Sequence, residues 1–142
     1  MLFNISYSSK KTEGEINALM GDPFSFIQRI KMGGVGTSKL QIVEASQNIA
    51  DLIQDRSASH YCYLELRPKG LMVGFQSHLR SFVLCIPFYE LSIYYNGGLL
   101  SIYGKSGSFK LEAPFNSRVD KKYLSKVLSM KAEFLSGQNF NA

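Results

Sequence analysis

Short apolar or alternating runs, separated by turn residues, dominate residues 61–113. Each run has the length of an ordinary β-strand, and the breaks between runs hold Pro, Gly, Asn or Ser. The pattern therefore predicts six strands. They cover residues 61–67, 71–76, 80–86, 91–95, 99–103 and 109–113.

The break between the fourth and fifth runs contains Asn96 and Gly97. An Asn-Gly pair adopts positive φ at low cost, as the tight turn of a β-hairpin requires. We therefore expect residues 91–95 and 99–103 to pair as antiparallel neighbours.

Alternation within the runs predicts that one face of the sheet is the core face. In the first run the apolar side chains are Cys62, Leu64 and Leu66. The side chains expected on the opposite face are Tyr61, Tyr63, Glu65 and Arg67. In the third run Phe82, Leu84 and Ile86 share a face in the same way.

The first part of the chain has weaker patterns. Residues 1–21 begin with alternating apolar positions and continue as a polar stretch, which predicts an edge strand or a loosely ordered arm. Residues 22–59 form a predicted N-terminal helical segment. In it, Asp22 is suited to cap a helix over residues 23–32, and Gly33 is suited to end that helix.

Apolar residues recur at helical spacing within residues 23–32, namely Phe24, Ile27 and Ile30. Residues 39–44 alternate like a strand and are a candidate for a seventh strand, whereas residues 46–55 have a helical pattern. Both interpretations compete over residues 39–55.

A longer helix is predicted over residues 116–137, after Pro114 ends the last strand. Ser117 is suited to cap this helix, and Asp120 supplies an acidic first turn. Its apolar stripe consists of Val119, Tyr123, Val127, Met130 and Phe134, widened by Leu124, Leu128 and Leu135. Such a stripe must be buried, so we expect the helix to dock on the strands.

Antiparallel strands followed by one amphipathic helix resemble the pleckstrin-homology-like barrel, in particular its small bacterial and GRAM-type branches. The resemblance rests on the hairpin around residues 67–70, the sequence IPFYEL at residues 86–91, the hairpin over residues 99–113 and the final helix. It implies a mainly β fold with α: an antiparallel six- or seven-stranded barrel or half-barrel, capped by the C-terminal helix, with one or two short N-terminal helices. The stretches KMGG, LELRPKG and IPFYEL also resemble a small uncharacterised bacterial family, which implies no known activity.

Composition adds a basic surface to this picture. The 142 residues, 45% of them hydrophobic and 13% aromatic, predict a single globular domain over residues 1–142 and exclude the disordered class. A net charge of +5 and a pI near 9.2 favour encounters with anionic partners such as lipid or nucleic acid. The candidate ligand or anionic-surface residues are Arg67, Lys69, Arg80, Lys121, Lys122 and Lys126.

Reactive chemistry is sparse. The glycine-rich residues 33–39 end in Lys39, but a phosphate-binding loop needs Lys directly after its last Gly and a preceding parallel strand. We therefore interpret this segment as a capping or flexible loop. His60 and His78 are the only histidines, and the sequence lacks the short ligand spacing of a metal site. We predict no catalytic residue, no metal and no cofactor.

The two cysteines, Cys62 and Cys85, lie within predicted strands, which favours reduced, buried and unreactive thiols. The N-terminus lacks the pattern of a signal peptide. The longest apolar segment, residues 82–95, is interrupted and is shorter than a membrane span. We therefore expect no transmembrane segment and a cytoplasmic location.

The leading functional hypothesis is a non-enzymatic binding module that holds a protein partner through an exposed strand edge or loops. The alternative is a small-ligand or enzyme site in the barrel mouth, built from Glu65, Glu90 or tyrosines. A second alternative is weak binding of anionic lipid or nucleic acid. It would use Lys121, Lys122 and Lys126. For nucleic acid, five tyrosines near basic residues could also stack with bases: Tyr61, Tyr63, Tyr94, Tyr95 and Tyr103. The sequence specifies neither the partner nor the oligomeric state.

Overall fold

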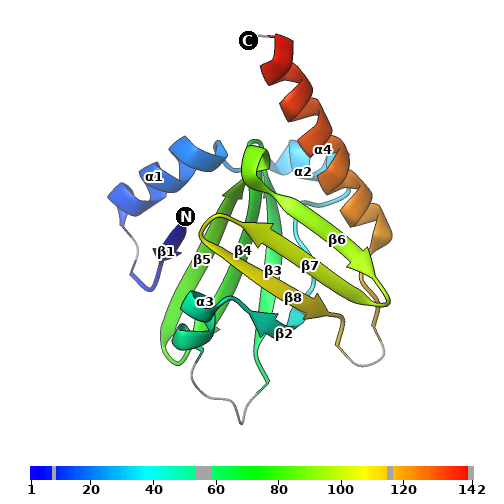
Figure 1. Ribbon diagram of the computed structural model, residues 1–142. Helices are drawn as coiled ribbons and strands as arrows, with labels where there is room; N and C mark the ends of the chain where they lie inside the picture. The colour runs from blue at the N-terminus through cyan, green and yellow to red at the C-terminus, as the bar shows by residue number, and fades with distance from the viewer. Residues whose placement is uncertain (8, 54–58, 115–116, 141–142) are drawn as a thin grey trace.

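The computed structural model describes residues 1–7, 9–53, 59–114 and 117–140. Within these ranges the chain forms one antiparallel sheet of eight strands, with four α-helices around it (Figure 1). The strands are β1 (Leu2–Asn4), β2 (Leu40–Ala45), β3 (Tyr61–Arg67), β4 (Gly70–Ser77), β5 (Arg80–Pro87), β6 (Ser92–Asn96), β7 (Leu99–Gly104) and β8 (Gly107–Glu112). The helices are α1 (Lys10–Met20), α2 (Phe26–Met32), α3 (Gln47–Leu52) and α4 (Lys121–Phe140), with a 3-10 turn η1 (Phe88–Glu90).

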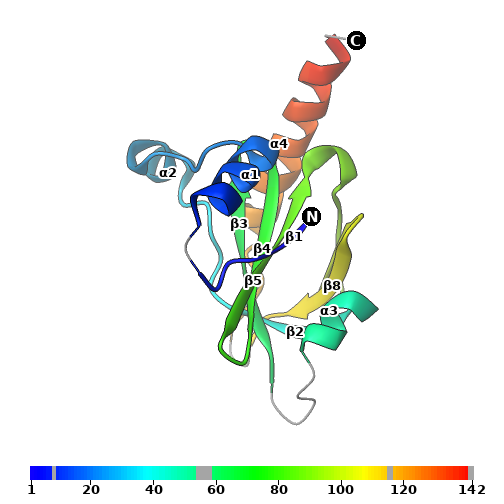
Figure 2. The same cartoon turned by 90° about the vertical axis from the view of Figure 1, so that its left-hand side faces the viewer.

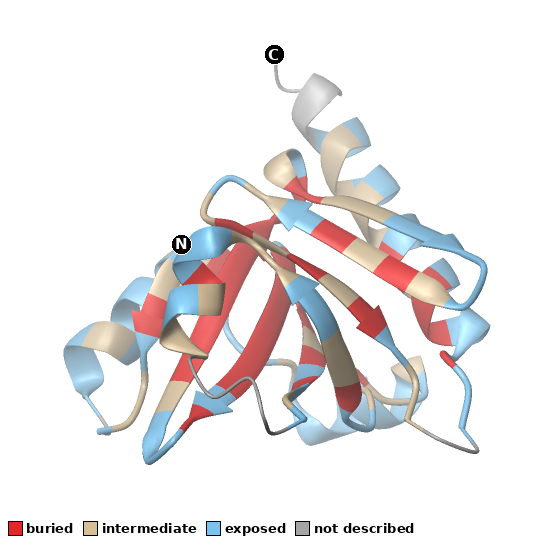
Figure 3. Ribbon diagram, turned by 60° about the horizontal axis from the view of Figure 1, so that its bottom comes forward, coloured by how far each residue is buried: buried red, intermediate tan, exposed pale blue. Residues whose placement is uncertain are grey.

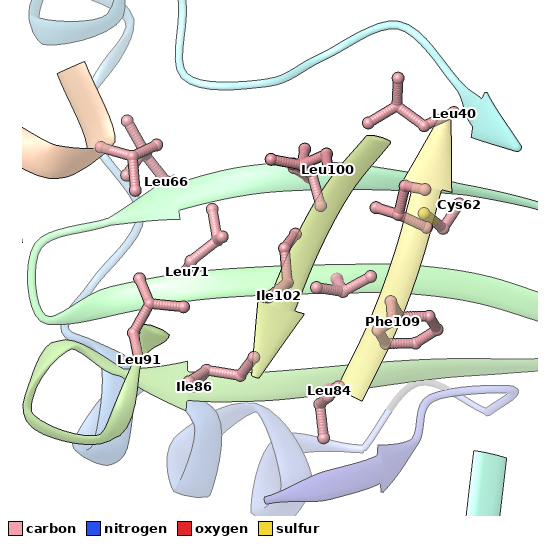
Figure 4. Packing of buried hydrophobic residues seen from close by; sticks show 14 of the residues in the cluster. Leu40, Cys62, Leu66, Leu71, Leu84, Ile86, Leu91, Leu100, Ile102 and Phe109 are labelled. Carbon is pink, nitrogen blue, oxygen red and sulfur yellow. The ribbon is translucent and has the colours of Figure 1, made fainter. Parts of the chain in front are cut away.

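The sheet folds across itself at β2. Its strand order is β1-β5-β4-β3-β2-β8-β7-β6, and the register between β2 and β8 shifts between Ile42 and Glu44. A bulge of this kind bends a strand and increases its twist. As a result β8 and β7 lie across β3, β4 and β5, with β6 beyond them (Figures 1 and 4).

The sheet is open, because its edge strands β1 and β6 do not pair with each other. Of the predicted barrel or half-barrel, the closed barrel is therefore wrong, and so is the predicted count of six or seven strands. The strand missing from the predicted count is β1, which comes from the segment expected to be an edge strand or an arm. The predicted seventh strand is present as β2. The mainly β class with α, the antiparallel pairing and the C-terminal helix are confirmed.

All six strands predicted within residues 61–113 are present, and β3 has the predicted bounds. Pro87 is the last residue of β5 rather than a break before the next strand. The predicted hairpin is confirmed, since β6 pairs antiparallel with β7. Gly97 and Gly98 form its two-residue turn, with φ of 60° and 81°, which is the positive-φ pair that a type I′ turn requires.

The main core lies between the two halves of the folded sheet. Leu66 and Leu71 from one half lie opposite Leu100 and Ile102 from the other (Figure 4). The predicted alternation is confirmed, because the sets Cys62, Leu64, Leu66 and Phe82, Leu84, Ile86 are all buried in this cluster. Buried residues run almost without interruption along β4 and β5, since both faces of these strands are covered (Figure 3).

The helix α1 covers the outer face of the sheet. It is formed by the residues that were expected to be a polar stretch. Ile16 and Met20 of α1 pack against Met72, Val83 and Cys85, which point away from the main core. Figure 2 shows α1 in front of the sheet. The expectation of a loose arm in this segment is therefore wrong. Its helix has few apolar residues, and it is held by tertiary contacts that its own sequence pattern does not show.

The start of α2 differs from the prediction. Ser25, and not Asp22, caps the helix: its side chain accepts a hydrogen bond from the Gln28 amide, and the Gln28 side chain accepts one from the Ser25 amide. This reciprocal capping box satisfies two donors that a helix start leaves unpaired. Gly33 ends the helix, as predicted, and it adopts the left-handed conformation.

Residues 39–55 contain both of the predicted elements, a strand and a helix. The first part is β2, and the second is the short helix α3, which begins after Ser46. Residue 55, the predicted end of that helix, lies outside the described residues.

The C-terminal helix begins later than predicted. Its first residue is Lys121, and Asp120 acts at the cap, because the Asp120 carboxylate accepts a hydrogen bond from the Lys122 amide at 2.9 Å. Residue 116, its predicted start, lies outside the described residues, and the helix continues past the predicted end to Phe140. The apolar stripe is confirmed as the docking face, with Val119, Tyr123 and Val127 buried. Leu128 is 50% exposed, so its assignment to the stripe is wrong.

Candidate functional site

The free edge of β6 is the candidate site. Among the described residues, β6 pairs only with β7, in a register that brings Asn96 opposite Leu99 across the two-residue turn. In such a hairpin the pair next to the turn is hydrogen-bonded, and bonded and non-bonded pairs then alternate. Tyr94 is therefore bonded to Ser101, whereas Ile93 and Tyr95 direct their backbone N–H and C=O groups away from β7.

The outward backbone groups of Ile93 and Tyr95 are open to a partner. Within the described part of the chain, these groups make no hydrogen bond. Proteins usually protect such an edge with charged residues, proline or a covering segment. Between Glu90 and Lys105, however, the sequence holds neither a charged residue nor a proline.

One side of α4 lies next to this edge. Lys131 donates a hydrogen bond from its Nζ to the carbonyl oxygen of Leu91, the residue before β6. Leu124, on the same side of the helix, lines a small cavity together with Leu100 of β7. Because residues three and four apart share a side of a helix, Leu128 faces the same way. Its half-exposed side chain is thus available beside the edge.

The five tyrosines that were candidates for nucleic-acid binding lie on three different surfaces. Tyr94 and Tyr103 meet edge to face on the outer side of β6 and β7, with ring centroids 6.2 Å apart. Tyr95 alternates with Tyr94 and shares the inner side with Ile93. Tyr61 and Tyr63 lie on the outer face of β3, in the other half of the sheet. They therefore do not form one stacking platform for nucleic acid.

Arg67, a predicted ligand residue, is 5% exposed and bonded within the chain. Its Nε donates to the carbonyl oxygen of Gly21 at 3.1 Å, and another guanidinium nitrogen donates to the Asn17 side chain. A third contact, 3.5 Å long, joins it to the Glu65 carboxylate. These bonds hold α1 and its C-terminal cap against the sheet.

Lys126 also makes a hydrogen bond within the chain, since its Nζ donates to the carbonyl oxygen of Gly34 at 2.7 Å. The other four predicted residues are exposed, but the fold does not gather them. Lys69 lies in the turn at one end of β4 and Arg80 beyond the other end, whereas Lys121 and Lys122 begin α4. The six candidates do not form one anionic-surface patch.

The glycine-rich segment runs alongside β3. The Leu66 amide donates to Val35, and the Thr37 amide donates to Leu64, so the segment extends the sheet. The hydroxyl of Tyr123 donates to Val35 at 2.8 Å and fixes α4 on top of it. A cavity of about 130 Å³ remains between this segment and the start of α4. It is smaller than an ordinary ligand pocket.

Both cysteines are buried and reduced, as predicted. Burial raises the pKa of Cys62 to about 12 and that of Cys85 to about 11, which disfavours the reactive thiolate. Of the two carboxylates proposed for a barrel-mouth site, Glu65 lies on the outer face of β3 and Glu90 ends η1. Across residues 1–7, 9–53, 59–114 and 117–140, no group of three or more His, Cys, Asp or Glu side chains is placed to hold a metal ion.

None of the described helices is both long and apolar enough to span a membrane. No family model, curated protein or solved structure matches the chain in comparisons with known proteins. The sequence predicted binding through an exposed strand edge or loops but did not identify β6 as that edge. Two signals were present: the charge-free stretch around the Gly97-Gly98 turn and the apolar Leu128.

Proposed function

We propose that this protein is a non-enzymatic binding module that holds an extended segment of a partner protein as an added strand on β6. The observation that carries the proposal is the uncharged and unpaired edge of β6. An added strand would bond to the outward groups of Ile93 and Tyr95. Main-chain bonds of this kind supply affinity, and pockets for alternate side chains supply specificity.

The side chains on the two faces of β6 suggest the chemistry of the partner. Alternate side chains of an added strand would point inward beside Tyr95 and Leu128, and the others would point outward beside Tyr94. We therefore expect a segment with apolar residues at alternating positions. A segment with acidic flanks would also be favoured by the net charge of +5.

The other functional hypotheses have less support. The space between the sheet halves is filled by large apolar side chains, including Leu64, Leu100 and Phe109, which argues against a site inside the folded sheet. The exposed basic residues are dispersed, which weakens the anionic-surface alternative based on them. The pleckstrin-homology-like resemblance and the cytoplasmic location remain predictions.

The test is a selection of random extended peptides from a display library against the full chain, followed by measurement of their dissociation constants. Two variants of Tyr95 then separate the backbone from the side chain. Tyr95→Pro removes the outward N–H without touching the bonds to β7, and edge positions of this kind tolerate proline. Tyr95→Ala removes the same side chain and keeps the N–H.

We expect Tyr95→Pro to weaken binding of the selected peptides at least tenfold more than Tyr95→Ala. The amides of Ile93 and Tyr95 should also become protected from hydrogen exchange when the peptide is bound. Equal affinities for the two variants, or protection at another surface, would contradict strand addition at β6.

A further inference from the structure

The helix α2 presents three large apolar side chains to solvent. Phe26 is 70% exposed, Ile27 65% and Ile30 63%, and no residue of the helix is fully buried. At 100° per residue, these three positions span about 100° of the helix surface. They form one continuous apolar face, which we call the α2 face.

The fold holds the α2 face away from the body of the protein. Met32 and Phe24, at the two ends of the segment, pack against the main core. Met32 lies on the opposite side of the helix from Ile30, so anchoring it turns the α2 face outward. The capping box at Ser25 and the left-handed Gly33 fix both helix ends. In Figure 2 the helix projects beyond the sheet, to the side of α1.

Basic side chains flank the α2 face on both sides. Arg29 precedes Ile30 and Lys31 follows it, which places one cation on each margin of the apolar face. Both are exposed, and neither forms an ion pair with another described residue. Between Pro23 and Lys39 the chain has no acidic residue.

We propose that the α2 face binds the surface of an anionic lipid bilayer. Helices that lie in a membrane interface place aromatic and aliphatic residues at the boundary between headgroups and acyl chains, with Lys and Arg beside them. Phe26, Ile27 and Ile30 enter this boundary, while Arg29 and Lys31 contact lipid phosphates. The lipid class is therefore an anionic phospholipid such as phosphatidylserine.

A protein partner fits the α2 face less well. A stable protein interface takes about 20–30 residues from each side, whereas this face offers three apolar side chains on a projecting helix. A second copy would bring its own Arg29 and Lys31 against the same cations, and like charges repel. A bilayer needs neither a large nor a concave surface.

The α2 face is separate from the β6 edge. Lys126 of α4 bonds to Gly34, just after α2, whereas Lys131 bonds to Leu91, just before β6. The two lysines lie on different sides of α4, so this helix stands between the two surfaces. Membrane binding by α2 does not depend on strand addition at β6, and each can fail without the other.

The test is co-sedimentation of the full chain with vesicles of phosphatidylcholine alone, or of phosphatidylcholine mixed with phosphatidylserine. The first variant carries Phe26→Ser and Ile30→Ser. Its matched control is Leu79→Ser, because Leu79 is 100% exposed in the turn between β4 and β5, far along the chain from α2. A second variant carries Arg29→Gln and Lys31→Gln. All of these positions are exposed, and thermal unfolding checks that each variant folds.

We expect binding to the phosphatidylserine vesicles, a loss of about tenfold or more in the first variant, and no change in Leu79→Ser. The second variant should lose most of its preference for phosphatidylserine vesicles. If the first variant binds like the unaltered chain, or if neither vesicle binds, the proposal is wrong. Binding that depends only on the charges would indicate adsorption of a basic protein without insertion, which also overturns it.

Discussion

At the residue scale, Arg67 shows why a charge in a strand is an ambiguous signal. Its position on the face opposite Leu64 and Leu66 predicts exposure, and its neighbour Lys69 is indeed exposed. Arg67 is instead covered by α1, and its bonds to Gly21 and Asn17 replace its contacts with water. A side chain that holds two distant segments together is unsuited to bind a ligand.

Cys62 makes the stability of the protein sensitive to alkaline pH. Burial raises the pKa of its thiol from 9.0 to about 12. Above about pH 9 the unfolded chain loses this proton and the folded chain keeps it, so the free energy of unfolding falls as pH rises. Below pH 9 both states hold the proton, and this stabilisation is fully present.

We expect Cys62→Ala to reduce the loss of stability between about pH 8 and about pH 10 by roughly 1.4 kcal/mol. The measurement is urea unfolding at both pH values. The control is Leu64→Ala, which creates a cavity in the same strand without removing a titratable group. If Cys62→Ala and Leu64→Ala lose the same amount of stability over this range, the thiol does not cause the effect.

At the element scale, the two faces of α4 have different roles. Its core face holds the helix on the sheet through Tyr123 and Val127, and Val119, just before the helix, is buried with them. The side that carries Leu128 and Lys131 turns toward β6. The helix is thus both a structural support and one wall of the candidate site.

Adjacent alanine substitutions distinguish these roles. Val127→Ala should lower the free energy of unfolding by about 1–3 kcal/mol, because Val127 is fully buried. Leu128→Ala should lower it by no more than about 1 kcal/mol, although it removes a larger side chain. Urea unfolding measures both. A larger loss of stability for Leu128→Ala than for Val127→Ala would mean that α4 is rotated so that Leu128, and not Val127, faces the core.

At the scale of the whole molecule, the open sheet leaves β6 with one free edge. This predicts a contrast in amide hydrogen exchange between neighbouring residues. The Tyr94 amide is bonded to β7 and should exchange at least about tenfold more slowly than the amides of Ile93 and Tyr95. Exchange measured by NMR on the unliganded chain tests this. Equal protection at all three amides would indicate that the edge is paired or covered, as in a closed barrel.

Local patterns predicted much of the architecture. The period of two identified six strands, and the Asn96-Gly97 pair identified a hairpin, although Gly97 and Gly98 form its turn. The helical stripe identified the docking face of α4. These features depend on residues close together in the chain. The helix α1 was missed because it has few apolar residues and its stability depends on packing against β5.

The sequence by itself determined the class of the fold, the positions of most strands and the face of α4 that is buried, because short-range periodicity and turn geometry govern all three. Tertiary structure decided that Arg67 is buried, that β6 is an edge and that the α2 face points outward. Each of these depends on contacts between distant residues, such as Leu2 with Leu84 in the pairing of β1 and β5. Exposure of a side chain is a property of the assembled fold, so the two candidate surfaces could be located only from the structure.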